Sequence, residues 1–263
     1  MTKLLEGKNA LVFGVANKRS IAWGITQAFH QQGANVGISY AGEPLKRRAV
    51  PLAESLGIEF VEPCDVTSDE EIEAVAKKAK SHFGEIDILV HSIAFAGMDL
   101  LKGPYYNTTR EGFRSTLEIS AFSFVALAKA FQPMLREGAS IMTLTYYASE
   151  KVFPNYNVMG VAKAALEASM RFLARDFGAQ GVRVNALSPG PIRTLAAAGV
   201  SGFKTLYKRF ADHAPLRKDI TAEDVGNAAV FLASKLSEKT TGQVIFIDSG
   251  YNIMGLTEKF GDD

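Results

Sequence analysis

The chain has 263 residues, a formal net charge of +1 and 47% hydrophobic residues. This composition can fill one large core, and the balanced charge gives no reason to expect a nucleic acid or a membrane surface as a partner. The one cysteine, Cys64, excludes an intrachain disulfide and fits a reducing compartment. We expect a cytoplasmic protein, because the chain has no apolar run of about 18 residues and its start lacks a signal-peptide pattern.

The first part of the chain alternates short apolar runs with segments typical of helices. Ser20 is a candidate N-cap, and Gly33 is a candidate helix end. Strands are predicted at 9–14, 35–40, 58–62 and 87–91, and helices at 20–33, 44–57 and 68–83.

The same alternation continues after a long loop. Apolar and β-branched residues at 139–147 predict a strand. The segment 156–178 predicts a helix, and its residues 158–166 are apolar nearly all round, which indicates a buried helix. The other predicted elements are a helix at about 116–135, strands at 182–188 and 243–247, an irregular segment with short helices at 191–219, a helix from 221 to about 234, and a frayed polar tail at 257–263.

The predicted strands are mostly continuous apolar runs, which indicates a parallel sheet covered on both faces. No linker, repeat or low-complexity stretch divides the chain, so residues 1–263 are predicted to form a single domain. Right-handed crossovers then give an α/β, Rossmann-like, doubly wound fold with a seven-stranded parallel sheet.

Tyr156 and Lys163 are the first candidate site. They are seven residues apart, about two helical turns, so the predicted helix places them on one face. The Lys163 charge would then lower the pKa of the Tyr156 phenol. A buried lysine also needs a partner, and a ligand hydroxyl or phosphate would serve. The alternative is a packed tyrosine followed by a solvated lysine.

Ligands of this fold class bind beyond the carboxyl ends of the strands. The turn 14–24 resembles a stretched dinucleotide fingerprint, in which Gly14 lets the backbone approach a pyrophosphate. The N–H groups after Ser20 and the helix dipole would bind the anion. An ordinary strand–helix turn is the alternative.

Further candidates follow the next strands. Asp65 could accept from the adenine amino group or cap a helix, and the small residues of 91–96 could admit the adenosine or form an ordinary loop. Glu43 lies about 20 residues past the glycines, where an acid favours NAD over NADP. No arginine stands at 41 or 42, and the bases at 46–48 are predicted to form a solvated helix face.

Together these motifs resemble the short-chain dehydrogenase/reductases. Ordinary members have a lysine four residues after the tyrosine, where this chain has Gly160. The longer spacing is similar to that of the bacterial enoyl-[acyl-carrier-protein] reductases. The segment 185–191 also carries the resemblance to the short-chain dehydrogenase/reductases. The segments 91–96, 109–113, 146–164 and 191–197 carry the resemblance to the enoyl reductases.

The resemblance implies reduction of the C2=C3 double bond of trans-2-enoyl thioesters carried on acyl carrier protein, with NADH, in the last reductive step of fatty-acid elongation. In that reaction the hydride lands on C3 while charge develops on the more distant thioester oxygen. Three extra residues add about 4.5 Å along a helix, in the direction that this chemistry requires. An ordinary ketone or alcohol dehydrogenase and a non-catalytic nucleotide-binding regulator are the competing hypotheses.

The resemblance also implies roles for single residues. Tyr156 would hydrogen-bond the thioester oxygen, Lys163 would hold the nicotinamide ribose, and Tyr146 would line the same pocket. Ala96 would touch the thioester. The cofactor would be held by Gly14, Ser20, Ile21, Asp65, Val66, Ile93, Lys163, Ile192, Arg193, Thr194, Leu195 and Ala196. Ala41 stands where related chains often have a polar residue, so NADP stays open; no metal is expected.

The segment 192–213 is predicted to be a lid over the substrate. Gly199 and Gly202 interrupt good helix formers, which gives the segment hinges. A rigid pair of surface helices is the alternative. Apolar residues suited to an acyl chain are Leu195, Ala196, Ala197, Val200 and Phe203, and bases for docking the acidic carrier protein are Lys204, Lys208 and Arg209.

A homotetramer is predicted from the apolar character of the helices at about 116–135 and 156–178. Their large apolar residues exceed what one sheet face can cover, and closed symmetry buries the rest. These residues are Phe122, Phe124, Val125, Leu127, Leu166, Met170 and Phe172.

Overall fold

The structure is a computed structural model that describes residues 3–194, 197 and 203–255, without the side chains of 203–206 and 208. Seven parallel strands form one sheet in the order β3-β2-β1-β4-β5-β6-β7. This confirms the predicted doubly wound fold, and its switch point lies between β1 and β4. The strands are β1 (Asn9–Phe13), β2 (Asn35–Tyr40), β3 (Val61–Pro63), β4 (Ile86–His91), β5 (Leu135–Leu144), β6 (Arg183–Pro189) and β7 (Val244–Ile247).

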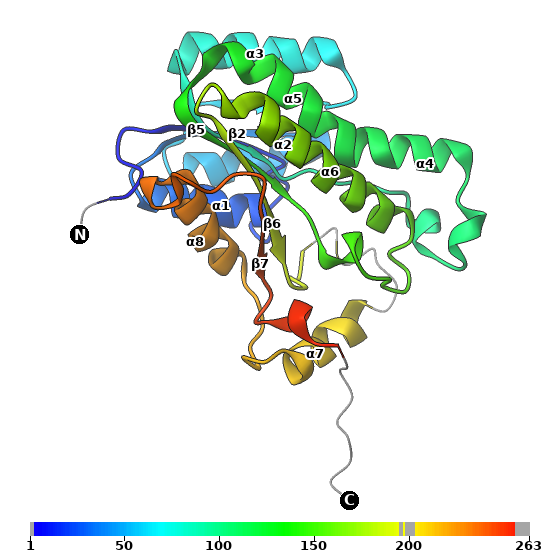
Figure 1. Cartoon of the computed structure of the whole chain (residues 1–263). Helices are drawn as coiled ribbons and strands as arrows, with labels where there is room; N and C mark the ends of the chain where they lie inside the picture. The colour runs from blue at the N-terminus through cyan, green and yellow to red at the C-terminus, as the bar shows by residue number, and fades with distance from the viewer. Residues whose placement is uncertain (1–2, 195–196, 198–202, 256–263) are drawn as a thin grey trace, which may run out of the picture.

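Helices cover both faces of the sheet (Figure 1). On one face are α1 (Ile21–Gln31), α2 (Gly42–Glu54) and α8 (Ala222–Ala233), and on the other are α3 (Asp69–Phe83), α5 (Ser123–Phe131) and α6 (Val158–Gly178). Both layers are apolar: Trp23 and Phe29 pack under the first, and Phe124 and Leu166 under the second. None of the helices in the described part of the chain is long and apolar enough to cross a membrane.

Helix α7 (Phe203–His213) lies apart from both layers, beyond the carboxyl ends of β6 and β7 (Figure 1). Phe210 anchors it, because this side chain is buried and its ring lies 5.1 Å from that of Tyr251. The predicted lid therefore contains one regular helix at the ligand edge of the sheet. Leu195, Ala196 and Val200, the side chains of Phe203, Lys204 and Lys208, and the tail 257–263 lie outside the described residues.

The helix predicted at about 116–135 differs most from the structure. Helix α4 (Arg110–Leu117) begins six residues earlier, with Thr109 as its N-cap. A π turn at Glu118–Phe122 joins it to α5, which ends at Phe131. The sequence gives no periodicity signal for a π turn, because the hydrophobic pattern of the flanking helices continues through it. Strand β5 begins at Leu135, four residues before the predicted start of this strand. It ends at Leu144, three residues before the predicted end.

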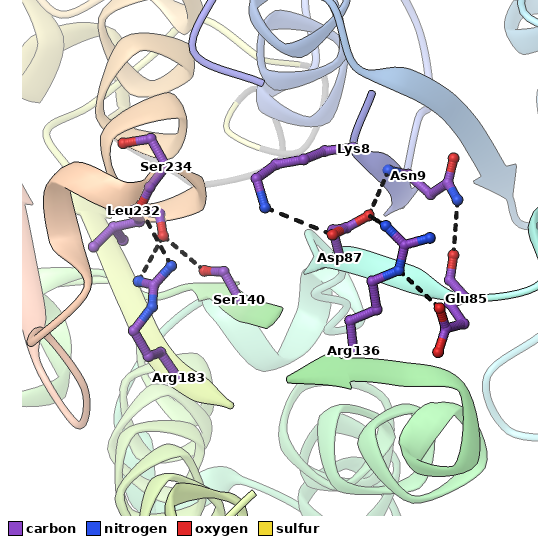
Figure 2. Close-up of polar contacts among 9 residues, drawn as sticks. All are labelled: Lys8, Asn9, Glu85, Asp87, Arg136, Ser140, Arg183, Leu232 and Ser234. Atoms are coloured by element: carbon purple, nitrogen blue, oxygen red, sulfur yellow. Dashed lines mark hydrogen bonds and ion pairs between the residues drawn. The ribbon is translucent and has the colours of Figure 1, made fainter. Parts of the chain in front are cut away.

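Polar side chains, of which Asp87 and Arg183 are buried, tie the helices and strands together at the amino-terminal edge of the sheet (Figure 2). Asp87 accepts from the Asn9 backbone N–H at 2.9 Å and from Arg136 Nη1 at 3.5 Å, which joins three strands. Arg183 Nη1 donates to the Leu232 carbonyl at 2.7 Å and so fixes the end of α8 on β6. These charged side chains have hydrogen-bond partners within the protein, at the edge opposite to the one where ligands bind in this fold class.

Helices α1 and α8 cross in backbone contact through glycines. A Cβ atom on Gly24 would lie 2.5 Å from the Ala222 carbonyl oxygen, and one on Gly226 would lie 2.8 Å from the Gly24 carbonyl oxygen. Gly24 closes the predicted dinucleotide turn, but the structure shows that this position packs a helix against its neighbour.

Gly24→Ala should lower the free energy of unfolding by about 1–3 kcal/mol, because neither backbone can move away without disturbing the sheet. Urea denaturation measures this change. The matched control is Gly178→Ala at the end of α6, where an added Cβ meets nothing within 4 Å. That variant should be neutral or more stable by up to about 1 kcal/mol, and equal stability of the two variants would contradict the packing argument.

Candidate active site

The turn between β5 and α6 carries the central aromatic side chains. Tyr146 follows β5 almost directly, and its ring lies 5.1 Å from the rings of both Phe153 and Tyr156. The sequence predicts that Tyr156 lies in the helix, but Tyr156 lies two residues before α6 begins. The reason is its neighbours, Asn155 and Asn157, whose φ angles of +64° and +41° are left-handed and cannot continue a helix.

The prediction that Lys163 lowers the pKa of Tyr156 is wrong. Burial raises the pKa of the Tyr156 phenol above its ordinary value, and burial also raises that of Tyr146. Water that would solvate a phenolate is excluded, and the Lys163 ammonium is held by the backbone of β5. Tyr156 is therefore a neutral hydrogen-bond donor, which suits it to bind an oxygen that becomes negative.

Lys163 is buried in α6, as predicted, with 4% of its surface exposed. Its Nζ donates to the Leu144 carbonyl at 2.7 Å, so the protein itself supplies the partner that the sequence predicts to be a ligand group. Burial lowers the pKa of Lys163 to about 8, and the Glu167 carboxylate opposes that shift. Glu167 stands one helical turn to the C-terminal side of Lys163.

A buried histidine lies under this edge of the sheet. The two ring nitrogens of His91 are 2.8 Å from the hydroxyl oxygens of Thr143 and Ser123. Burial, and then the charge of Lys163, lower the pKa of His91 to about 3. His91 is thus a neutral link between β4, β5 and α5. A polar residue ending an otherwise apolar strand was the available signal for it.

The π turn fixes the loop after β4. The Ser120 hydroxyl accepts from the Phe95 N–H at 2.9 Å and donates to the Phe95 carbonyl at 3.1 Å. This pair of hydrogen bonds holds the loop that contains Ile93 and Ala96, both half-buried. Sequence reasoning missed Ser120, because its role depends on the unpredicted π turn.

The first strand–helix turn fits an anion. Ser20 is the N-cap of α1 and accepts from the Trp23 N–H at 3.3 Å. This leaves Ile21 and Ala22 with N–H groups that have no acceptor within the helix, at the positive end of its dipole. Gly14 has φ +99°, and a Cβ there would lie 2.1 Å from the Ser92 carbonyl oxygen. The close approach that Gly14 permits is therefore to the backbone after β4.

The candidates after β2 and β3 have partners of their own. Asp65 Oδ1 accepts from the backbone N–H and the hydroxyl of Thr67, at 2.9 and 2.8 Å. Ser68 caps α3, so the alternative of Asp65 as the N-cap is wrong. Glu43 is exposed and pairs with Lys46 at 3.0 Å.

The remaining predicted residues follow β6. Ile192 is buried, and the Arg193 guanidinium lies 4.2 Å from the centre of the Tyr207 ring. Leu195 and Ala196 are not described, whereas Thr194 is half-buried. The described candidates follow β1, β3, β4, β5 and β6, so the parallel sheet brings them to one edge. Among the described residues no group of three or more His, Cys, Asp or Glu could hold a metal ion.

Known proteins resemble the chain over nearly its whole length. The family model described as enoyl-(acyl carrier protein) reductase matches residues 14–252. The chain belongs to the enoyl-[acyl-carrier-protein] reductase family. Two NADH-named members are similar to it: Bacillus cereus enoyl-[acyl-carrier-protein] reductase is 51% identical over 96% of this chain and all of its own, and Rhizobium meliloti reductase 2 is 48% identical over 97% and 96%.

Solved structures of enoyl-[acyl-carrier-protein] reductases have the same fold. The Bacillus cereus reductase with NADP+ and an indole naphthyridinone has a TM-score of 0.95 and 50% identity, covering 97% of this chain and 100% of that one. The Anaplasma phagocytophilum reductase with NAD has a TM-score of 0.94 and 44% identity, covering 98% and 99%. These findings confirm the family that the motifs predict.

The His91 imidazole should stay neutral through the range near pH 6.5 where an ordinary histidine titrates, because its pKa is about 3. Proton–nitrogen NMR of the ring checks this, with the His91 signals assigned by their loss in His91→Asn. A titration midpoint near the ordinary value would contradict the neutral link.

Proposed function

We propose that this protein reduces the C2=C3 double bond of trans-2-enoyl thioesters on acyl carrier protein with NADH, in the last reductive step of fatty-acid elongation. The observation that carries the proposal is the position of Gly160. A Cβ there would lie 2.8 Å from the Ala148 carbonyl oxygen, so a lysine has no room at that point of α6. The lysine that an ordinary ketone reductase has at this position therefore does not fit at residue 160. The lysine of this chain, Lys163, lies about one turn farther along α6.

The residues then have separate tasks. The neutral Tyr156 phenol donates to the thioester oxygen and stabilises the negative charge that develops there during conjugate reduction. Tyr146 packs on Tyr156 and fixes the direction of its ring. Lys163 directs its ammonium to the ribose of the cofactor. NADH, when bound, supplies the hydride that C3 receives.

The described residues proposed to bind the cofactor lie at the edge of the sheet where the strands have their carboxyl ends. Ser20 and Ile21 would hold the pyrophosphate, and Asp65 the adenine, while Val66, Ile93 and Ala96 would pack against the ligands. The segment 192–196 would pass along the pyrophosphate and nicotinamide. Relatives named for NADH favour that cofactor, although one solved relative contains NADP+. The Glu43–Lys46 pair also favours NADH, because the carboxylate already neutralises this base.

The segment 192–213 is proposed as the lid over the acyl chain. The contact of Phe210 with Tyr251 would anchor its carboxyl-terminal part, and Arg193 packs on Tyr207 within the segment. Gly199 and Gly202, the hinges that the sequence predicts, lie outside the described residues. Arg209 is exposed on α7, where an acidic carrier protein could reach it.

A homotetramer is also proposed, but fewer apolar residues support it than the sequence predicts. Phe124, Leu127, Leu166 and Met170 are buried within the chain itself, so they need no partner subunit. Phe172 on α6 and Phe122 in the adjoining π turn are 74% and 57% exposed. Two large aromatic side chains on packed elements favour contact with another copy. The free thiol of Cys64 supports a reducing, cytoplasmic compartment.

Tyr156→Phe should lower kcat with crotonyl-coenzyme A and NADH by about 10²–10³, with the Kd for NADH kept. Lys163→Ala should raise that Kd and slow the reaction as well. The matched control is Tyr147→Phe, whose lost hydroxyl donates to the Asn252 carbonyl rather than toward the substrate. Unchanged kcat in Tyr156→Phe, or unchanged NADH affinity in Lys163→Ala, would reject the assigned role.

The lid should gain protection from hydrogen exchange when NADH and a non-reactive acyl thioester bind together. Peptides spanning 192–213 should slow, while peptides from the buried strand β4 should not change. Equal exchange of 192–213 in both states would favour the rigid helix pair.

Phe172→Glu should convert the tetramer into a smaller assembly, because a charge placed in the interface would be buried without a partner. Light scattering at micromolar concentration measures the mass. Leu236→Glu, at a position 66% exposed after α8, is the control and should stay tetrameric. A monomeric wild type would refute the assembly.

A further inference from the structure

Helix α6 contacts the end of β5 through two charged side chains. Lys163 Nζ donates to the Leu144 carbonyl at 2.7 Å, and the hydroxyl of the next residue, Thr145, donates to Glu167 Oε1 at 2.6 Å. Lys163 and Glu167 are one helical turn apart, so they lie on the same face. Both are buried, with 4% and 6% of their surface exposed.

Such burial requires compensation, because an isolated charge in a protein interior is costly. Two opposite charges one turn apart in α6 compensate each other. Lys163 has a fixed partner in the last residue of β5, Leu144, and Glu167 has one in the next residue, Thr145. Among the described residues, the charge of Lys163 acts on His91 of β4, and Tyr156 lies in the turn before α6. His91 and Tyr156 are neutral here, and Glu118, on the π turn packed against α6, acts instead on Arg114.

We propose that Glu167 is a positioning residue, which Thr145 anchors so that its carboxylate keeps Lys163 charged and aligned on Leu144. The ammonium is then ready for the cofactor ribose, a step that rests on the function proposed above. Glu167 does not touch the substrate in this account; it acts through Lys163.

The direction of the effect follows from the burial of Lys163. Burial favours the uncharged amine and lowers the pKa of Lys163 to about 8, even with the Glu167 carboxylate opposing it. Removal of that carboxylate lowers the pKa further. The ammonium is then lost at a lower pH, while it is restored on acidification below the new pKa.

Glu167→Gln tests this, because its amide oxygen still accepts from Thr145 while the charge is lost. Carbon-13 NMR of ε-labelled lysine in the whole protein gives the titration midpoint of Lys163, assigned by Lys163→Met. The midpoint should fall by about one pH unit or more. Asp176→Asn, which removes one charge from the exposed end of the same helix, should leave it in place.

An unchanged midpoint in Glu167→Gln, or an equal fall in Asp176→Asn, would overturn the proposal. If Glu167→Gln does not fold, Thr145→Val carries the test. That variant leaves the carboxylate without its anchor and should also lower the midpoint, though by less. An unchanged midpoint there would overturn the anchoring.

The KM for NADH separates this proposal from the proposed function. This KM should rise at alkaline pH, as Lys163 loses its charge. In Glu167→Gln the rise should move to lower pH by the same amount as the NMR midpoint, and the wild-type KM should be recovered at acid pH. General damage to the fold would raise KM at every pH. A shifted midpoint with an unmoved KM profile would uphold the Lys163–Glu167 pair and reject the ribose role of Lys163.

Discussion

The hydrogen bond from the buried Lys163 ammonium to the Leu144 carbonyl fixes helix α6 on the end of strand β5. This hydrogen bond can form only if helix α6 lies close to the turn that joins β5 to α6. Gly160 is required there, because any side chain would meet the Ala148 carbonyl. The helix cannot start earlier, since the left-handed Asn155 and Asn157 bend the chain. Tyr156 is thereby held over the same edge as Lys163, outside the helix.

The electrostatics of the edge follow from the same burial. Tyr156 and His91 are neutral, while Lys163 keeps a charge next to Glu167. In a region from which water is excluded, one fixed cation and one fixed donor act more strongly than they would in water. A diphosphate-bearing cofactor and a thioester oxygen that becomes negative are ligands that such an edge can stabilise. In the proposed function, the Lys163 cation therefore binds the cofactor and the Tyr156 phenol stabilises the developing charge.

Local patterns in the sequence were sufficient to predict the fold. Strand β2 has the predicted bounds, Asn35–Tyr40, because a continuous apolar run between turn residues has few other solutions. The spacing of Tyr156 and Lys163 was likewise readable, since it depends on the sequence alone. What could not be read depends on contacts between distant segments. In the sequence Gly24 resembles part of a phosphate-binding turn, and only the contact with α8 shows that it packs two helices together. No local pattern marks the π turn that positions Ser120.

The pairing of Glu167 with Lys163 illustrates the same limit. Its spacing of four residues is visible in the sequence, but a solvated pair has that spacing too. Only the burial of both side chains, and the two bonds to Leu144 and Thr145, distinguish this pair from a surface pair. Burial is a property of the tertiary structure, so sequence reasoning assigned Lys163 a ligand as its partner.

The central claim is that conjugate reduction, rather than carbonyl reduction, takes place at this edge. Transfer of deuterium from NADH labelled at the reactive position of the nicotinamide tests it most directly, with crotonyl and acetoacetyl thioesters offered together. NMR of the products locates the label. The expected result is a butanoyl thioester with deuterium at C3 and unreacted acetoacetyl thioester. Deuterium at the former ketone carbon, with the crotonyl thioester left intact, would contradict it.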